Sequence, residues 1–137
     1  MTRFSDIHDA FLFVSSDSYG INSAVLCKDT EKILYRSEMG GFDEIEEGDL
    51  DWDECIMIPH KNDLDLGQQL VFEFVEMYFP DDYDRVRHIF QKRGAYGRFK
   101  NFLESKQLIG TWYEFETQRE QQALQQWCTE NEIEISC

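Results

Sequence analysis

The segment from residue 59 to residue 67 holds the side chains best suited to chemistry, namely His60, Lys61, Asn62, Asp63 and Asp65. An imidazole beside two carboxylates could act as a general base, or could bind a metal ion together with an aspartate. The same residues also have a structural explanation. Asp65 can cap a helix, Asn62 and Asp63 favour turns, and His60 can hold the connection by hydrogen bonds. We favour the structural explanation and keep a hydrolytic or metal-dependent enzyme as the alternative.

A second candidate is the acidic segment, residues 43–54. It contains eight acidic residues and no basic one, in a chain of 137 residues with 28 acidic and 13 basic side chains and a net charge of −15. Its carboxylates and Trp52 could contact a basic surface on a protein partner, or could keep a solvated loop soluble. Both interpretations stay open. The candidate interaction residues in this segment are Asp43, Glu44, Glu46, Glu47, Asp49, Asp51, Trp52 and Asp53.

Basic residues gather in the basic segment, residues 85–106. It has seven basic residues and one acidic residue, with aromatic residues between them. This composition suits single-stranded RNA, whose bases stack on aromatic rings and whose phosphates need neutralising. However, aromatic residues at helical spacing should face the core. The basic side chains can then pair with the acidic segment or offset the negative surface. We favour the second interpretation, with Arg93, Arg98 and Lys100 as candidate interaction residues.

Sequence motifs for catalysis, cofactors and metals are missing. The chain has no Gly-x-Ser-x-Gly elbow, no His-Glu-x-x-His pair and no glycine-rich phosphate loop, so we expect no catalytic residue, no cofactor and no metal site. The four cysteines are irregularly spaced, which indicates reduced thiols. We expect Cys27, Cys55 and Cys128 to be buried, with Cys137 at the terminus.

Hydropathy and charge bear on location and partners. No apolar run approaches the roughly 20 residues needed to span a bilayer, and the N-terminus lacks the basic start and apolar stretch of a secretory signal. We therefore expect a cytoplasmic protein. Its negative charge argues against membranes and against nucleic acid as general partners, because both are themselves negatively charged.

The elements that position these residues change character along the chain. Short β-rich runs separated by turn residues predict an antiparallel meander, with residues 16–20 as its first loop and an acidic, mobile loop at about 40–54. After Pro59 the apolar period changes from two to about 3.6, which indicates helices. The predicted strands are residues 10–15, 23–28, 32–36 and 55–58.

The second half predicts about four helices and a final strand. Asp65 caps the first helix, which ends at Pro80, and the second runs from Asp82 to a left-handed Gly94. The third covers residues 95–105, and the fourth starts at a capping box, residues 111–114, and ends near residue 131. Residues 133–135 alternate like a strand that joins the N-terminal sheet. The whole chain, residues 1–137, is therefore predicted to be a single α+β domain in which the meander packs against the helices.

Several of these segments resemble the uncharacterised bacterial family UPF0158. The resemblance covers the chain from about the third predicted strand to the C-terminus. It implies a small cytosolic bacterial protein of the same fold, and it brings no established activity, catalytic residue or cofactor. The matching segments are residues 59–67, 93–96, 98–100, 112–113, 123–124 and 127–128.

The function that these observations favour is a protein-interaction module without catalytic activity. Its acidic segment would bind, and in the narrower form inhibit, a basic surface of a protein partner. The alternatives are the enzyme built on His60, Asp63 and Asp65, and RNA binding through the basic segment.

Overall fold

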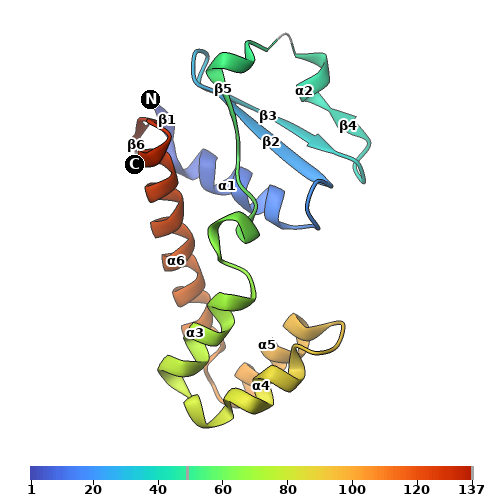
Figure 1. Cartoon of the computed structure of the whole chain (residues 1–137), viewed down its shortest axis with the longest axis vertical. Helices are drawn as coiled ribbons and strands as arrows, with labels where there is room; N and C mark the ends of the chain where they lie inside the picture. The colour runs from blue at the N-terminus through green and yellow to red at the C-terminus, as the bar shows by residue number, and fades with distance from the viewer. Residues whose placement is uncertain (49, 137) are drawn as a thin grey trace. The chain divides into compact units, whose positions relative to one another are not determined.

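The computed structural model describes residues 1–48 and 50–136. Its elements form two compact units (Figure 1). The sheet unit comprises residues 1–64 and 121–137, and the helical unit comprises residues 65–120. Helix α6, Ile109–Glu130, begins in the helical unit and ends in the sheet unit. The sequence predicts one domain, and the contacts of the chain group into two compact units, a division that does not by itself decide the number of domains. The α+β class is confirmed.

The sheet unit is built on an antiparallel sheet with strand order β4-β3-β2-β5. In the register, Val25 on β2 lies opposite Leu34 on β3 and Met57 on β5. The predicted second, third and fourth strands are confirmed to within about one residue. The strands are β2 (Asn22–Cys27), β3 (Lys32–Ser37), β4 (Phe42–Asp43) and β5 (Cys55–Met57).

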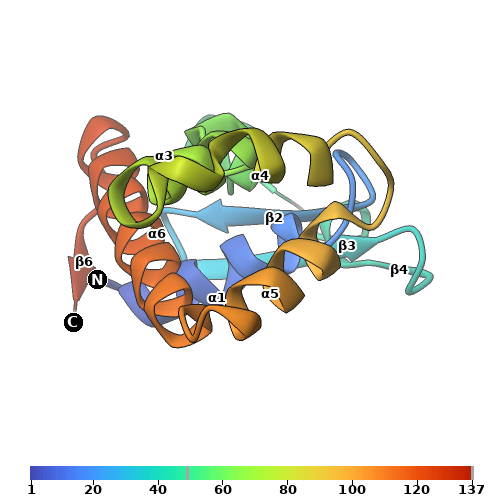
Figure 2. The same cartoon turned by 90° about the horizontal axis from the view of Figure 1, so that it is seen from below.

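Helix α1, Phe4–Ser15, covers one face of this sheet (Figures 1 and 2). Phe13 on α1 meets Tyr35 on β3 edge-on, with ring centroids 5.1 Å apart. The prediction of a strand at residues 10–15 is wrong. The buried residues of α1 are three and four positions apart, as on one face of a helix. This pattern starts before residue 10, so the apolar run at residues 10–15 does not show it. The buried residues are Ile7, Ala10, Phe11 and Val14.

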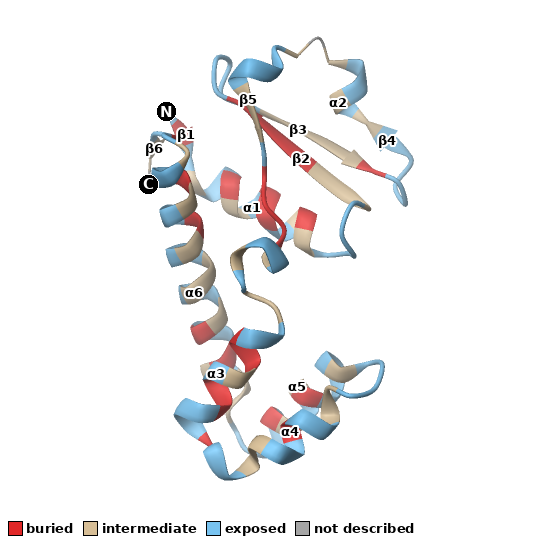
Figure 3. Ribbon diagram, in the orientation of Figure 1, coloured by how far each residue is buried: buried red, intermediate tan, exposed pale blue. Residues whose placement is uncertain are grey.

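The acidic segment covers the opposite face of the sheet. Leu34 points to that face because strand side chains alternate, and a methyl group on Gly48 would lie 3.1 Å from Leu34 Cδ1. Val25, opposite Leu34, is fully buried. Figure 3 shows much of β2 in red, the colour of buried residues. The segment is therefore more than the mobile loop that the sequence predicts. It contains part of β4, helix α2 (Glu44–Glu47) and a 3₁₀ turn, η1 (Trp52–Glu54).

A separate pair of strands joins the two ends of the chain. Strand β1, Thr2–Arg3, pairs in parallel with β6, Ile135–Ser136 (Figures 1 and 2). The C-terminal strand thus exists, but it does not add to the four-stranded sheet. The sequence missed β1, because two residues are too few to show a strand period.

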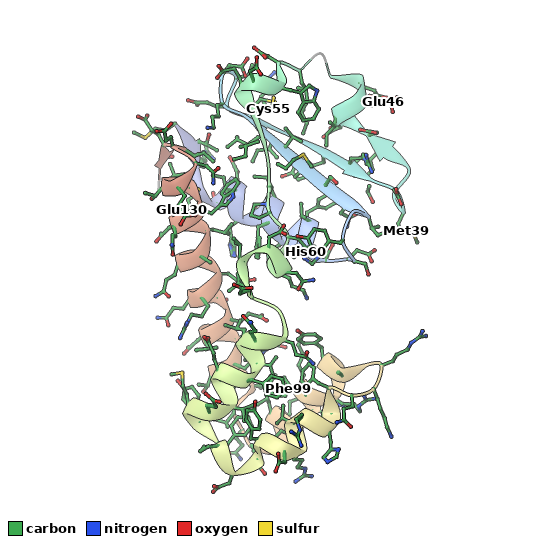
Figure 4. The ribbon with its side chains drawn as sticks, in the orientation of Figure 1. Met39, Glu46, Cys55, His60, Phe99 and Glu130 are labelled. Carbon is green, nitrogen blue, oxygen red and sulfur yellow. The ribbon has the colours of Figure 1, made fainter. Side chains whose placement is uncertain are left out.

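The helical unit packs around aromatic side chains. Phe74, Phe99 and Trp112 belong to this cluster, and Phe74 and Phe99 each meet the indole in a T-shaped arrangement. Phe99 is labelled in Figure 4. The third predicted helix is confirmed at both ends. The elements are α3 (Gln68–Tyr78), the 3₁₀ turn η3 (Pro80–Asp82), α4 (Tyr83–Ile89), α5 (Ala95–Ser105) and the first part of α6.

Three predicted helix boundaries are wrong. Helix α3 starts at Gln68 after Gly67, and Asp65 takes a left-handed φ of 57° instead of capping it. Helix α6 starts at Ile109, so Thr111 lies inside the helix and forms no capping box. Gly94 has the predicted left-handed φ, 75°, but it precedes α5 rather than ending α4. In each case a good local signal lies two or more residues from the actual helix end.

Candidate functional site

His60 lies in the sheet unit, between β5 and a 3₁₀ turn, η2 (Lys61–Leu64), and only 3% of its surface is exposed (Figure 4). Its Nδ1 accepts a hydrogen bond from the Asn62 backbone N–H at 3.1 Å. The ring proton must therefore be on Nε2, which lies 2.9 Å from the Asp17 carbonyl oxygen and donates to it. Both ring nitrogens are thus engaged with the backbone.

The residues around His60 add further contacts that hold the same segment. The His60 backbone N–H donates to Asp63 Oδ2 at 3.0 Å, and the Asp63 N–H donates back to the His60 carbonyl at 2.9 Å. The Lys61 N–H donates to Ser15 Oγ at the end of α1. Tyr19 stacks on the imidazole with ring centroids 4.8 Å apart. The segment after β5 is therefore tied to α1 and to the loop that follows it.

This geometry leaves little for catalysis. A general base needs a nitrogen free to take a proton, and both nitrogens of His60 already have partners. The carboxylate of Asp63 supports the backbone, and Asp65 belongs to the helical unit. Over residues 1–48 and 50–136, no three His, Cys, Asp or Glu side chains gather as metal ligands would. His60, Lys61, Asn62 and Asp63 therefore form a connection through these hydrogen bonds, with the Asn62 side chain exposed, and Asp65 takes no part in it.

The sequence alone does not indicate the partners of His60. Asp17 and Tyr19 lie more than forty positions away, in a loop that the sequence marks only as a connection. A pocket of about 210 Å³ adjoins them, lined in part by Tyr19, Asn22, Met57 and His60. Its walls combine aromatic and apolar surface with few free polar groups, so it does not resemble a reaction centre.

The acidic segment holds itself in shape with some of its own carboxylates. Asp43 Oδ1 accepts from the Glu46 N–H at the start of α2, and Asp51 Oδ1 accepts from the Asp53 N–H at η1. Glu44 Oε1 accepts from the Tyr35 N–H on β3 at 2.9 Å. These three candidate residues therefore cap helices or pair with the sheet. Asp49 lies outside the described residues.

Four other carboxylates of the segment form no contacts that would hold the fold within the described residues. Within the described residues, the side chains of Glu46, Glu47, Asp53 and Glu54 have no hydrogen bond or ion pair, and all four are exposed. Glu46 is visible on α2 in Figure 4. Trp52, on η1 in the same segment, has 57% of its surface exposed. A large aromatic side chain in water next to unpaired charges is typical of a binding surface.

A shallow depression of about 470 Å³ lies at the β4 side of this segment. Its walls include the carboxylates of Glu38, Asp43 and Glu47 and the half-exposed ring of Phe42. Arg36 also lines it, and Arg36 Nη2 lies 3.7 Å from Glu38 Oε1. The lining therefore combines one basic side chain with several carboxylates.

The candidate interaction residues of the basic segment have separate roles in the helical unit. Arg98 Nη2 donates to the carbonyls of Ile89 and Lys92, at 3.1 and 3.0 Å, and so closes the turn between α4 and α5. Lys100 Nζ lies 5.6 Å from the ring centroid of Tyr113. Arg93 is exposed, with no partner among the described residues. These three residues therefore do not act as one patch.

Replacing Arg98 with alanine is expected to destabilise the protein by about 1 kcal/mol, because two carbonyls lose a charged donor at an exposed site. Urea unfolding followed by circular dichroism measures the change. Arg93→Ala is the matched control, since it removes the same charge five residues away, and it should cost less than about 0.5 kcal/mol. Equal effects of the two variants would show that net charge, not the turn, is responsible.

The thiols of the sheet unit form a pair that the sequence did not predict. Cys27 is buried and Cys55 is half-buried, and Cys55 Sγ lies 3.4 Å from Cys27 Sγ. Burial, the hydrogen bond with Cys27 and the nearby carboxylates of Asp29 and Asp51 raise the pKa of Cys55 to about 11. Cys128 is buried and free, as predicted, whereas Cys137 lies outside the described residues.

The comparisons with known proteins agree with the resemblance noted in the sequence. The chain matches the uncharacterised protein family UPF0158 over residues 27–137, which includes every motif named above. Neither the curated proteins nor the solved structures gave a significant match. In the described part of the chain, no helix has the length and apolar character needed to cross a membrane. The match spans most of the chain, so the protein belongs to the UPF0158 family.

Proposed function

We propose that this protein is a non-enzymatic interaction module of the cytoplasm, whose acidic segment binds a basic surface on a protein partner. The observation that carries this proposal is the 57% exposure of Trp52 in a segment that also has four exposed carboxylates with no partner in the described chain. Solvent exposure of such a group costs free energy that a partner would recover. The carboxylates would supply orientation and selectivity, and the indole would supply buried contact area.

The distribution of charge between the units supports the same proposal. The sheet unit has 18 acidic and 5 basic residues, while the helical unit has 10 and 8, so their formal charges are −13 and −2. The field of the protein is therefore strongest around the sheet unit. A basic partner would be steered toward that unit, at a rate that falls as salt increases.

The order of the acidic segment adds to this support. Carboxylates of Asp43, Glu44 and Asp51 fix its backbone to itself and to β3. A partner would meet carboxylates on a preformed scaffold and would not have to order a flexible chain, which lowers the entropic cost of binding.

The alternative functions have less support from the geometry. The enzyme alternative needs an unengaged imidazole, and both nitrogens of His60 have partners. RNA binding needs lysine and arginine side chains that are free to contact phosphates. In the basic segment, Arg98 is tied to two carbonyls and Lys106 Nζ pairs with Asp82 Oδ2 at 2.9 Å.

The test is reversal of the unpartnered carboxylates. A tagged protein captures partners from cells that naturally make it, and the captured protein is then purified and titrated by calorimetry. The variant Glu46→Lys, Glu47→Lys, Asp53→Lys and Glu54→Lys should weaken binding by at least about 100-fold, because attraction becomes repulsion. Trp52→Ala alone should weaken it about tenfold, the effect of losing one aromatic anchor.

The matched control reverses four exposed carboxylates of the helical unit that have no partner in the described chain. These are Glu76, Asp81, Glu104 and Glu114. The control has the same net charge as the test variant and should bind like the wild type. If both variants lose binding equally, the interaction reflects net charge alone, and the proposal is wrong. It is also wrong if neither loses binding.

A further inference from the structure

We propose that Cys27 and Cys55 form a modification site, a dithiol that low-molecular-weight disulfides such as glutathione disulfide oxidise to an intramolecular disulfide. This inference is independent of the proposed partner. It depends on the way β2 and β5 bring two thiols together that lie 28 residues apart in the sequence.

The register of β2 and β5 places the two cysteines directly opposite each other. The adjacent pair Lys28–Glu54 is hydrogen-bonded, with the Lys28 N–H donating to the Glu54 carbonyl at 2.8 Å. The pair Ala24–Ile58, three positions away on the other side, is hydrogen-bonded too, with the Ile58 N–H donating to the Ala24 carbonyl at 2.9 Å. Hydrogen-bonded and non-hydrogen-bonded pairs alternate along antiparallel strands, so Cys27 and Cys55 form a non-hydrogen-bonded pair.

That type of pair has the geometry a disulfide requires. Its Cα atoms are about 4.5 Å apart in a regular sheet, and disulfides join Cα atoms separated by about 4.4–6.8 Å. The side chains of Cys27 and Cys55 point to the same face, and their sulfurs are already 3.4 Å apart. Closing the bond needs side-chain rotation and a small approach of the sulfurs, with no change of register.

The two thiols differ in exposure, and this difference sets the order of the reaction. Cys55 is half-buried and Cys27 is only 3% exposed, so the external disulfide meets Cys55 first. The Cys55 thiolate attacks one sulfur of glutathione disulfide and expels one glutathione thiolate. The Cys27 thiolate then attacks Cys55 Sγ and expels the second. The two thiol protons pass through water to the two glutathiones, so the protein loses two hydrogens and the reagent gains them.

Oxidation would change the acidic segment without touching its carboxylates. Residues 28–54 lie inside the closed loop, and the segment ends at Glu54, immediately before Cys55. The bond would fix the end of the segment to the centre of the sheet, next to Val25 and Leu34. The oxidised protein should therefore exchange the amide hydrogens of residues 43–54 more slowly than the reduced protein.

The experiment uses the full-length protein with Cys137→Ala, which leaves the pair and the buried Cys128. The pKa of Cys55, about 11, leaves only a small thiolate fraction near neutral pH. The protein is therefore incubated with glutathione disulfide at about pH 9, and is then quenched in acid, alkylated and digested with trypsin. Mass spectrometry should find a loss of two hydrogens. It should also find peptide 4–28 joined to peptide 37–61, because trypsin cuts after Arg3, Lys28, Arg36 and Lys61.

Two single variants serve as controls. With Cys27→Ala, the reaction should stop at a mixed disulfide between Cys55 and glutathione, and with Cys55→Ala the buried Cys27 should react at least about tenfold more slowly than Cys55. The main result comes from the protein that keeps both Cys27 and Cys55, so it does not depend on whether these single variants fold. The proposal is overturned if both thiols stay reduced, or if the protein with both cysteines accumulates the mixed disulfide.

Discussion

Replacing Trp112 with alanine is expected to destabilise the helical unit by about 3–5 kcal/mol, the usual cost of removing a large buried aromatic side chain. Only 1% of Trp112 is exposed. Phe74 and Phe99 meet its ring edge-on, with centroids 5.2 and 5.3 Å away, and Phe115 lies at 6.2 Å. These rings come from α3, α5 and α6, so one substitution opens a cavity at the place where three helices meet.

The control variant, Trp112→Phe, should cost only about 1 kcal/mol. It keeps an aromatic ring in the cluster and removes the indole Nε1–H, which is buried without a hydrogen-bond partner in the described chain. Removing an unsatisfied buried donor offsets part of the lost packing. Guanidinium unfolding followed by far-UV circular dichroism compares the two variants. An equal loss in both would mean that an aromatic ring at this position does not provide the stability of this site, because Trp112→Phe keeps one.

The helices of the helical unit could be predicted from sequence because each has a single buried stripe. Helix α5 shows this best. Phe99 and Leu103, four residues apart, are its buried residues, and both of its ends were predicted correctly. Such spacing is a local property, so it survives without knowledge of the rest of the fold.

The boundaries and the N-terminal helix could not be predicted in the same way, because tertiary contacts decide them. Asp65 and Thr111 are good capping residues, yet α3 and α6 begin at Gln68 and Ile109. In α1, the run at residues 10–15 reads as a strand when it is taken alone. Its helical period becomes visible only when Ile7 is included, and packing against the sheet then selects the helix.

The candidate site was predictable in its residues but not in its partners. His60 was expected to hold a connection by hydrogen bonds, and it does so. Its acceptor Asp17 and its stacking partner Tyr19 come from a loop next to α1, the helix that was mistaken for a strand. The pairing of Cys27 with Cys55 depends in the same way on the register of two strands far apart in sequence. Spacing along the chain does not encode such contacts.

The structural role of His60 leads to the second large effect. His60→Ala is expected to destabilise the protein by about 2–3 kcal/mol, because it removes two hydrogen bonds and a stacked ring from a buried position. Asn62→Ala is the matched control. The Asn62 side chain is exposed, and the bond to His60 comes from its backbone N–H, which the substitution keeps. The control should therefore stay within about 0.5 kcal/mol of the wild type.

Two conservative variants separate the two hydrogen bonds of the ring. In His60→Asn, the side-chain oxygen can replace Nδ1 as acceptor for the Asn62 N–H, and in His60→Gln, the side-chain nitrogen can replace Nε2 as donor to the Asp17 carbonyl. Each should recover about 1 kcal/mol of the loss, measured as a shift of the urea unfolding midpoint. A histidine kept for catalysis behaves in the opposite way, because functional groups are often held at the expense of stability. If the alanine variant is as stable as the wild type, His60 is again a candidate general base. The expected loss, partly recovered in the Asn and Gln variants, identifies His60 as the residue that joins β5 to the loop after α1.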